Sequence, residues 1–255
     1  MINFKMNYNH QIFDQTPKII LSPHYDDFIF SLGGLAWHWS NHSKPPTTNL
    51  VLFSQSGYAN DQNQFLSASV AAVSQLRLKE EQRALGELHN VKLILGHQLD
   101  APLRGYRDVT RPRHFKLLSE RALHRKLTDL IISVFRLNGQ IFIPLAIGSH
   151  IDHLLVRDVA MKLIKSAEFN QKKSFYFYED LPYAGSRELA DKKNATEFIK
   201  NNHLRPIEFE ISLIEKLRLI NFYPSQLNEK TIKEIKFHAS SISLKGDFER
   251  VWWLP

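Results

Sequence analysis

Short apolar runs alternate with longer helical patterns along the first two thirds of the chain. The apolar runs predict five strands, at 18–22, 49–54, 91–95, 140–144 and 174–178. Apolar residues at helical spacing predict helices at 27–39, 65–89, 114–135 and 153–167. Strands that alternate with helices in this way imply βαβ units. We therefore expect an α/β fold with a mostly parallel sheet, covered by helices on both faces.

The pattern is less regular after residue 183. Helices are predicted near 209–220 and 228–236, and the closing VWWLP is expected to pack against the body of the protein. No internal repeat, low-complexity tract or linker rich in proline or glycine divides the chain. A length of 255 residues also fits one large domain. We therefore expect a single domain over 1–255.

Composition limits the kinds of site that the chain can build. The sequence has 43% hydrophobic and 23% charged residues, as is usual for a globular protein, and it has no cysteine. Disulfides and thiolate ligands are thereby excluded, so any metal must be held by nitrogen and oxygen atoms. No apolar run reaches the ~20 residues of a membrane span, and the start of the chain does not resemble a secretory signal. A cytoplasmic location is expected.

The formal net charge is +7, and basic residues are dense between Arg104 and Lys126. Such a run usually forms a solvated face, and the alternative is that it attracts an anionic substrate, such as a phosphorylated or nucleotide-linked sugar. Nucleic-acid binding is not expected, because no known motif and no alternation of basic and aromatic residues accompanies the charge. The basic residues are Arg104, Arg107, Arg111, Arg113, Lys116, Arg121, Arg125 and Lys126.

Polar and titratable residues follow the predicted strands. In open α/β sheets, sites form outside the carboxyl ends of the strands. The segments that follow the five strands are 23–27 (PHYDD), 55–58 (QSGY), 96–100 (GHQLD), 148–153 (GSHIDH) and 179–180 (ED). We therefore expect a functional site at this edge of the sheet.

Two of these segments have the spacing of metal ligands. His24 and Asp27 are three positions apart, and so are His150 and His153. At a strand-to-helix junction, this spacing can place both side chains on one side of the turn. Two histidines and a carboxylate that leave open positions on a metal are typical of a catalytic site. The alternative, that each histidine caps a helix or fills a core hydrogen bond, fits a lone histidine better than two clusters at one edge.

These residues resemble the motifs of the PIG-L/LmbE-like N-deacetylases, which are zinc enzymes with a Rossmann-like fold. The first family motif, His-x-Asp-Asp followed by Gly-Gly, stands here in 22–34 (SPHYDDFIFSLGG). The second, His-x-Asp-His, stands at 150–153 (HIDH), and a looser third match is 178–183 (YEDLPY). The resemblance implies a three-layer αβα sandwich. Tyr25 and Phe28 depart from the residues common at their positions, but neither departure removes a ligand.

The matched positions imply a set of roles. The metal ligands would be His24, Asp27 and His153, which suit Zn²⁺, with Fe²⁺ as the alternative. Asp26 would act as general base for a metal-activated water. His150 would face the developing oxyanion as a protonated donor. Asp152 would orient His150 and keep it charged, or cap the helix, and the two roles are compatible.

The substrate contacts are expected around this centre. Arg77 either pairs with an acid near the site or forms a salt bridge on a helix surface. Asp100, Tyr178 and Glu179 are candidate substrate contacts, and Ser56 and Gly57 are expected to line the pocket through backbone groups. The resemblance covers about 18–185. The segment 186–255 matches nothing, and we expect it to pack on the core and to shape the pocket.

The resemblance implies hydrolysis of an N-acetyl group on an amino sugar or sugar conjugate. The main alternative is the same chemistry on another amide, such as an acylated amino-cyclitol, nucleoside or peptide-like group. A non-catalytic module that binds sugar conjugates is disfavoured, because the candidate base Asp26 and electrophile His150 are intact. Two histidines and a carboxylate also hold iron in non-haem oxygenases. Those sites usually lie in β-sandwich barrels, whereas this pattern predicts α/β.

Overall fold

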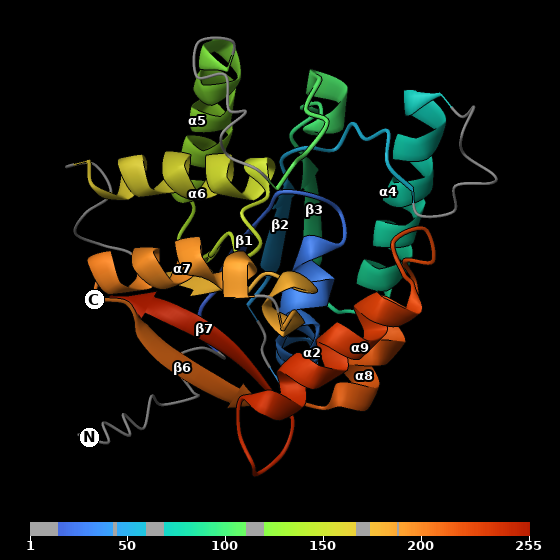
Figure 1. The fold of residues 1–255 in the computed structure, drawn as a ribbon, viewed down its shortest axis with the longest axis vertical. Coiled ribbons are helices and arrows are strands. Elements are labelled where there is room, and N and C mark those ends of the chain that lie inside the picture. Colours follow the sequence, from blue (N-terminus) through green and yellow to red (C-terminus); the bar gives the residue numbers. More distant parts are fainter. Residues whose placement is uncertain (1–14, 43–44, 60–68, 111–119, 167–173, 188) are drawn as a thin grey trace.

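The computed structural model describes residues 15–42, 45–59, 69–110, 120–166, 174–187 and 189–255, and within them seven strands form one sheet (Figure 1). The strand order is β3-β2-β1-β4-β5-β7-β6. The first five strands run parallel, whereas β7 is antiparallel to both β5 and β6. The expected mostly parallel sheet is therefore confirmed. The strands are β1 (Lys18–Ser22), β2 (Thr47–Val51), β3 (Val91–Leu95), β4 (Gln140–Pro144), β5 (Phe175–Tyr178), β6 (Arg205–Glu210) and β7 (Phe248–Leu254).

Helices cover both faces of the sheet, which gives the expected α/β/α layers (Figure 1). Helices α2 and α4 connect β1 to β2 and β2 to β3, while α5 and α6 connect strands in the opposite direction across the sheet. Because such crossovers are right-handed, the two pairs lie on opposite faces. The described helices are α2 (Asp27–His42), α4 (Val70–Gly86), α5 (Arg121–Phe135), α6 (Ile151–Ile164), α7 (Leu189–Asn201), α8 (Leu213–Ile220) and α9 (Glu229–Ser241), with short turns η1 (Pro102–Arg104) and η3 (Tyr183–Gly185). None of these helices is long and apolar enough to cross a membrane.

The C-terminal segment differs most from its prediction. Helix α7 was not predicted, and residues 209–210 belong to β6 rather than to a helix. In β6, Ile207 and Phe209 are buried between exposed neighbours, a period of two that is typical of a strand with one covered face. The closing VWWL belongs to β7, inside the sheet between β5 and β6. The predicted helical residues 65–68, 114–119 and 167 lie outside the described residues.

Helix α2 is kinked beside the glycine pair of the first motif, where Gly34 lies close to the C-terminal segment. Leu32 has non-helical backbone angles, so the helix is interrupted there. The N–H groups of Gly34 and Leu35 instead donate to the carboxylate of Glu249 in β7, both at 2.9 Å. A Cβ atom at Gly34 would lie 2.6 Å from the Cβ of Ile211. The absence of a side chain at Gly34 therefore lets the C-terminal segment pack closely against α2.

The order of the strands places a crevice beside β1. From β1 the chain proceeds outward to β2 and β3, and it later returns on the other side of β1 to form β4 and β5. Connections that leave β1 and β4 in opposite directions open a crevice at the carboxyl ends of these two strands, where ligands bind in folds of this kind. The first motif follows β1 and the second follows β4.

Candidate active site

Three predicted ligands meet at the carboxyl ends of β1 and β4. One potential ligand atom each of His24, Asp27 and His153 lies within 4.8 Å of the others, and all three residues are buried. His24 Nδ1 is 3.4 Å from Asp27 Oδ2, and His153 Nε2 is 3.5 Å from Asp27 Oδ1. A second group with the same closeness consists of His24, His150 and Asp152. Both groups share His24.

The loops that carry these residues are shaped by local hydrogen bonds. The backbone N–H of His24 donates to Asp27 Oδ2 at 2.6 Å, which fixes the carboxylate at the start of α2, where negative charge is favoured. After β4, Ala146, Gly148 and Ser149 all have positive φ. A Cβ at Gly148 would lie 2.5 Å from the Tyr183 ring. Backbone strain of this kind is typical of functional loops.

Each histidine of the first group has a carboxylate on its far nitrogen. His24 Nε2 is 3.0 Å from Asp152 Oδ2, and His153 Nδ1 is 2.6 Å from Asp180 Oδ1. The other oxygen of Asp180 accepts the N–H of Ile147 at 2.9 Å. Carboxylates in this position fix the tautomer and orientation of metal-binding histidines. The ring nitrogens of His24 and His153 that face Asp27 therefore have the arrangement that a metal requires.

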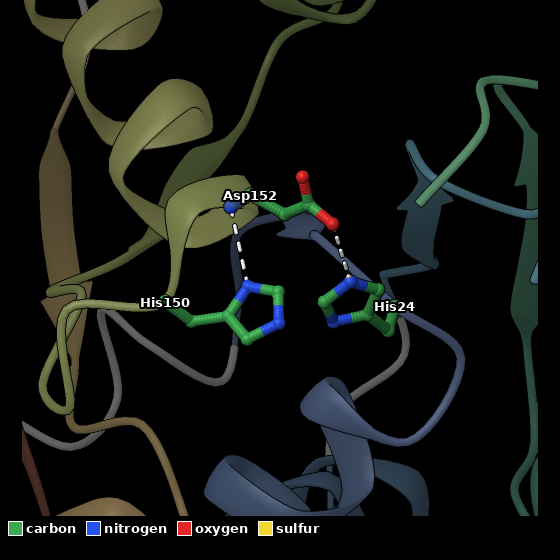
Figure 2. Close-up of side chains that lie close together, drawn as sticks. All are labelled: His24, His150 and Asp152. Carbon is green, nitrogen blue, oxygen red and sulfur yellow. Dashed lines mark hydrogen bonds and ion pairs between the residues drawn. The ribbon is translucent and has the colours of Figure 1, made fainter. Parts of the chain in front are cut away.

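The Asp152 carboxylate contacts a different histidine from the one expected (Figure 2). It contacts His24, while the backbone N–H of Asp152 donates to His150 Nδ1 at 3.2 Å. The expectation that the Asp152 carboxylate orients His150 therefore differs from the structure, and so does the expectation that Asp152 caps the helix. Helix α6 begins at Ile151, two residues earlier than predicted. His150 is consequently the N-cap, and Asp152 lies in the first turn.

Buried negative charge dominates the electrostatics of the centre. Burial alone lowers the pKa of His24, but hydrogen bonds to Asp152 and Asp27 outweigh it and raise this pKa to about 10. The pKa of His153 is also raised, because Asp27 and Asp180 outweigh burial. Burial raises the pKa values of Asp27 and Asp152, but the histidines lower them further. The surrounding carboxylates therefore stabilise positive charge at this centre, and its nitrogen and oxygen donor atoms fit a cation.

His150 differs from its two neighbours. Burial and the charge of His24 lower the pKa of His150 to about 3. Its Nδ1 also accepts the Asp152 N–H, which leaves Nε2 to carry the proton of the neutral ring. The protonated state predicted for His150 is therefore not the one that this structure supports.

A cavity of about 290 Å³ opens onto the cluster. Asp26 lies in its wall, and its Oδ1 accepts a hydrogen bond from Arg77 Nη2 at 2.6 Å, while Arg77 Nη1 donates to Ser56 Oγ at 2.8 Å. The structure thus shows the first alternative for Arg77, pairing with an acid near the site. Asp100 also lines the cavity. The lining consists of His24, Asp26, Asp27, Tyr58, Arg77, Asp100, Pro102, Val109, His150, His153, Leu181, Pro182, Tyr183 and Gln226.

Four predicted substrate contacts are not in this lining. Tyr178 is fully buried, and its hydroxyl donates to the carbonyl of Leu21 at 2.9 Å. Glu179 points to the C-terminal segment, where its carboxylate contacts three side chains: His238 at 2.6 Å, Trp252 at 2.9 Å and Arg250 at 3.4 Å. Ser56 is buried behind Arg77, and Gly57 faces the side chain of Leu103.

Sequence reasoning missed Asp180 and several residues of the cavity walls. Asp180 follows β5 directly, so its position at the functional edge was a usable signal, but Glu179 was chosen in its place. Tyr183 and Gln226 reach the cavity from η3 and from the segment between α8 and α9. No motif marks Gln226, and only the packing of the C-terminal segment places it there.

The basic segment divides into buried and exposed parts. The Arg104 side chain is only 10% exposed and pairs with Asp152 and Glu120. Arg107, Arg121, Arg125 and Lys126 are exposed. Arg111, Arg113 and Lys116 lie outside the described residues. The four exposed residues agree with a solvated face, and Arg104 belongs to the site.

Known proteins resemble this chain in sequence and in fold. No model of a known protein family matches it. The chain is 30% identical over 236 residues to the 2'-N-acetylparomamine deacetylase of Streptomyces fradiae, and the match covers 87% of this chain and 77% of that protein. A deacetylase of the teicoplanin biosynthesis pathway, solved in complex with teicoplanin, has a TM-score of 0.71 at 20% identity and covers 93% of this chain and 98% of its own. The N,N'-diacetylchitobiose deacetylase of Pyrococcus horikoshii has a TM-score of 0.65 at 18% identity, with coverages of 98% and 88%.

These comparisons carry different weight. The two structural likenesses lie below 25% identity and establish the fold alone. The sequence match spans most of both proteins. Together with the motifs at the ends of β1 and β4, it shows that this chain belongs to the PIG-L/LmbE-like deacetylases, as its sequence predicted.

Proposed function

We propose that this protein is a zinc-dependent N-deacetylase that releases acetate from an N-acetylated amino sugar within a larger conjugate. The observation that carries the proposal is the buried group of His24, Asp27 and His153 beside Asp26, at the base of one cavity. Membership of a deacetylase family supports the reaction. The geometry of the site supports the metal and the individual roles.

The first of the two overlapping groups is the better metal site. Asp152 already pairs with the Arg104 guanidinium at 2.8 Å, and a cation beside it repels a second cation. His24, Asp27 and His153 supply nitrogen and oxygen donors, a set that suits Zn²⁺, with Fe²⁺ as the alternative. The far ring nitrogen of each histidine is held by a carboxylate. When bound there, the metal would polarise the amide carbonyl and lower the pKa of a water molecule.

Asp26 is proposed as the general base. Arg77 holds Asp26 Oδ1 at 2.6 Å, and no described residue forms a hydrogen bond with Oδ2, which belongs to a side chain that lines the cavity. In the proposed reaction, the oxygen of water forms a bond to the acyl carbon and Asp26 takes a proton from that water. The C–N bond then breaks, the proton passes to the departing nitrogen, and the products are acetate and a free amine.

His150 is proposed as a donor to the carbonyl oxygen as negative charge develops there. Because its Nδ1 accepts the N–H of Asp152, the neutral ring carries its proton on Nε2. The ring lines the cavity, and its centroid lies 5.1 Å from that of His153. A neutral imidazole can stabilise an oxyanion by hydrogen bonding without a full positive charge. This role replaces the protonated donor predicted from the sequence.

The cavity favours a neutral or cationic substrate. Among the described residues, three carboxylates line it, from Asp26, Asp27 and Asp100, and the guanidinium of Arg77 in its wall is held by Asp26 and Ser56. Arg77 offsets Asp26 and a bound metal would offset Asp27, so the Asp100 carboxylate remains to disfavour an anionic sugar, whereas hydroxyl and ammonium groups would find acceptors. The named relatives act on or bind sugar-containing molecules such as 2'-N-acetylparomamine and teicoplanin. We therefore propose an amino-sugar conjugate, without the phosphate that the net charge suggested.

The test is to measure free amine released from a panel of N-acetylated sugars and sugar conjugates. The panel includes matched neutral, amine-bearing and phosphorylated members. Wild-type protein is compared with Asp26→Asn, with Asp129→Asn as a matched acidic residue exposed on α5, and with protein stripped of metal. We expect Asp26→Asn to lose about 10²- to 10⁴-fold in rate and Asp129→Asn to lose none. Zinc should restore the stripped protein. No release from any member, or full activity without metal, would refute the proposal.

A further inference from the structure

The segment after β3 clamps the buried carboxylate of Asp152. The N–H of Ala101 donates to Asp152 Oδ2 at 2.9 Å, and a guanidinium nitrogen of Arg104 lies 2.8 Å from Oδ1. Asp152 is fully buried, so these contacts and the one to His24 define its environment. Turn η1 brings the two partners together, and it is followed by Gly105, whose φ of 89° is readily adopted only by glycine.

Arg104 is itself held in place from several sides. Its Nε lies 3.1 Å from Glu120 Oε1, and the nitrogen that faces Asp152 also donates to the carbonyl of Leu99 at 2.8 Å. Glu120 Oε1 in turn accepts the hydroxyl of Tyr106 at 2.8 Å. The guanidinium carbon lies 5.0 Å from the centre of the Phe53 ring. A guanidinium with this many fixed partners is positioned before any ligand arrives.

We propose that Arg104 is a positioning residue that acts through Asp152 on the metal ligand His24. By binding Oδ1, Arg104 leaves Oδ2 directed at His24 Nε2, at 3.0 Å (Figure 2). His24 Nδ1 is thereby presented to Asp27, at 3.4 Å. This inference rests on the proposed metal site. It adds a further contact to that site, because the ligand His24 is held by the Asp152 carboxylate, which is held in turn by the Arg104 guanidinium.

The charges explain why the guanidinium matters. His24 lies between the carboxylates of Asp27 and Asp152, and both contact its ring. Without Arg104, Asp152 would be a buried carboxylate held through Oδ2 alone, by the Ala101 N–H and by His24. It would then be able to turn toward another donor, which would release His24 from the orientation that presents Nδ1 to the metal site. Loss of a partner in this outer layer typically weakens metal binding by about 10- to 100-fold.

The experiment measures zinc affinity of the full-length, metal-stripped protein by competition with a chelating dye. We compare wild type with Arg104→Met and Arg104→Lys, and use Arg157→Met as the matched control. Arg157 is a buried arginine on α6, the helix of Asp152, but it contacts Leu145, Asn194, Asp158 and the ring of Phe198 rather than the Asp152 carboxylate. We expect affinity to fall about 10- to 100-fold for Arg104→Met and less for Arg104→Lys, with Arg157→Met unchanged. Excess zinc should restore amine release by the Arg104 variants.

Each outcome separates this inference from the proposed function. If wild type binds no zinc, the proposed metal centre fails and the inference fails with it. If wild type binds zinc and Arg104→Met binds equally well, only the inference is overturned. Equal losses in Arg104→Met and Arg157→Met would also overturn it, because general destabilisation would then explain both. If Arg104→Met does not fold, the Arg104→Lys variant is used in its place. If that variant has a lowered melting temperature but binds zinc with wild-type affinity, Arg104 contributes to stability alone and the positioning role is refuted.

Discussion

Replacing Glu81 with glutamine should stabilise the protein at high pH and leave it nearly unchanged at low pH. Glu81 is fully buried between Asn49, which donates to Oε1 at 2.8 Å, and Tyr223, which donates to Oε2 at 2.7 Å. Burial raises the pKa of Glu81 from its usual 4.5 to about 8. Asp26 adds to this effect, and Arg77 and the two hydrogen bonds only partly oppose it. Glutamine resembles the protonated carboxyl in shape and can keep both contacts.

The direction of this pH dependence follows from the number of protons that the folded and unfolded states bind. Between pH 4.5 and about 8, the folded protein holds a proton on Glu81 that the unfolded chain has lost, so wild-type stability falls as pH rises through this window. The fall is about 1.4 kcal/mol per pH unit and totals on the order of 5 kcal/mol above the window. The variant lacks this loss. Its free energy of unfolding should therefore exceed that of wild type by an amount that grows with pH and then levels off.

Urea unfolding of both proteins between about pH 5 and pH 9 measures this difference. Glu229→Gln is the control, because the Glu229 side chain is 92% exposed and its removal should have no comparable pH dependence. A difference between Glu81→Gln and wild type that stays constant across the range would refute the reasoning. So would a variant that is less stable at the highest pH, because the ionised carboxylate would then be the better partner for Asn49 and Tyr223.

Three further predictions follow from single contacts. Asp180→Asn should weaken zinc binding about 10- to 100-fold in a chelator competition, because His153 Nδ1 loses its carboxylate at 2.6 Å; unchanged affinity would contradict the ligand role of His153. Gly34→Ala should cost about 1–3 kcal/mol in urea unfolding through its contact with Ile211, whereas Gly86→Ala, which meets no atom within 4 Å, should be neutral or stabilising. Tyr178→Phe should lower the free energy of unfolding by about 1 kcal/mol, because the hydrogen bond to the Leu21 carbonyl is lost, and should leave KM unchanged; a raised KM would indicate that Tyr178 contacts the substrate.

The sequence contained most of the information that locates the site. Strands β1, β3 and β4 were predicted residue for residue, because each is a short apolar run between polar neighbours. Their order fixes which loops share an edge of the sheet, so the loops that hold His24 and His153 could be expected to meet. This argument needs only the positions of the strand ends. It therefore does not depend on how any side chain packs.

The partners of the ligands could not be predicted in the same way. Whether Asp152 serves His24 or His150 depends on whether α6 begins at Ile151 or at His153, and the ends of helices are weakly encoded. The choice between Glu179 and Asp180 depends on which way each side chain turns after β5. Arg104 is one of many basic residues in its segment, and only its burial beside Asp152 sets it apart. These features depend on contacts between distant parts of the chain.

Helix α4 links the C-terminal segment to the chemistry of the site. Its Arg77 reaches Asp26 in the cavity, while Glu80, one turn later, accepts both the N–H and the hydroxyl of Ser225. Gln226 follows Ser225 and lines the same cavity. One helix thus fixes the orientation of the proposed base and the position of a wall that no sequence motif marks. Differences in the C-terminal segment can therefore alter which substrate fits while Asp26 and its arginine stay in place.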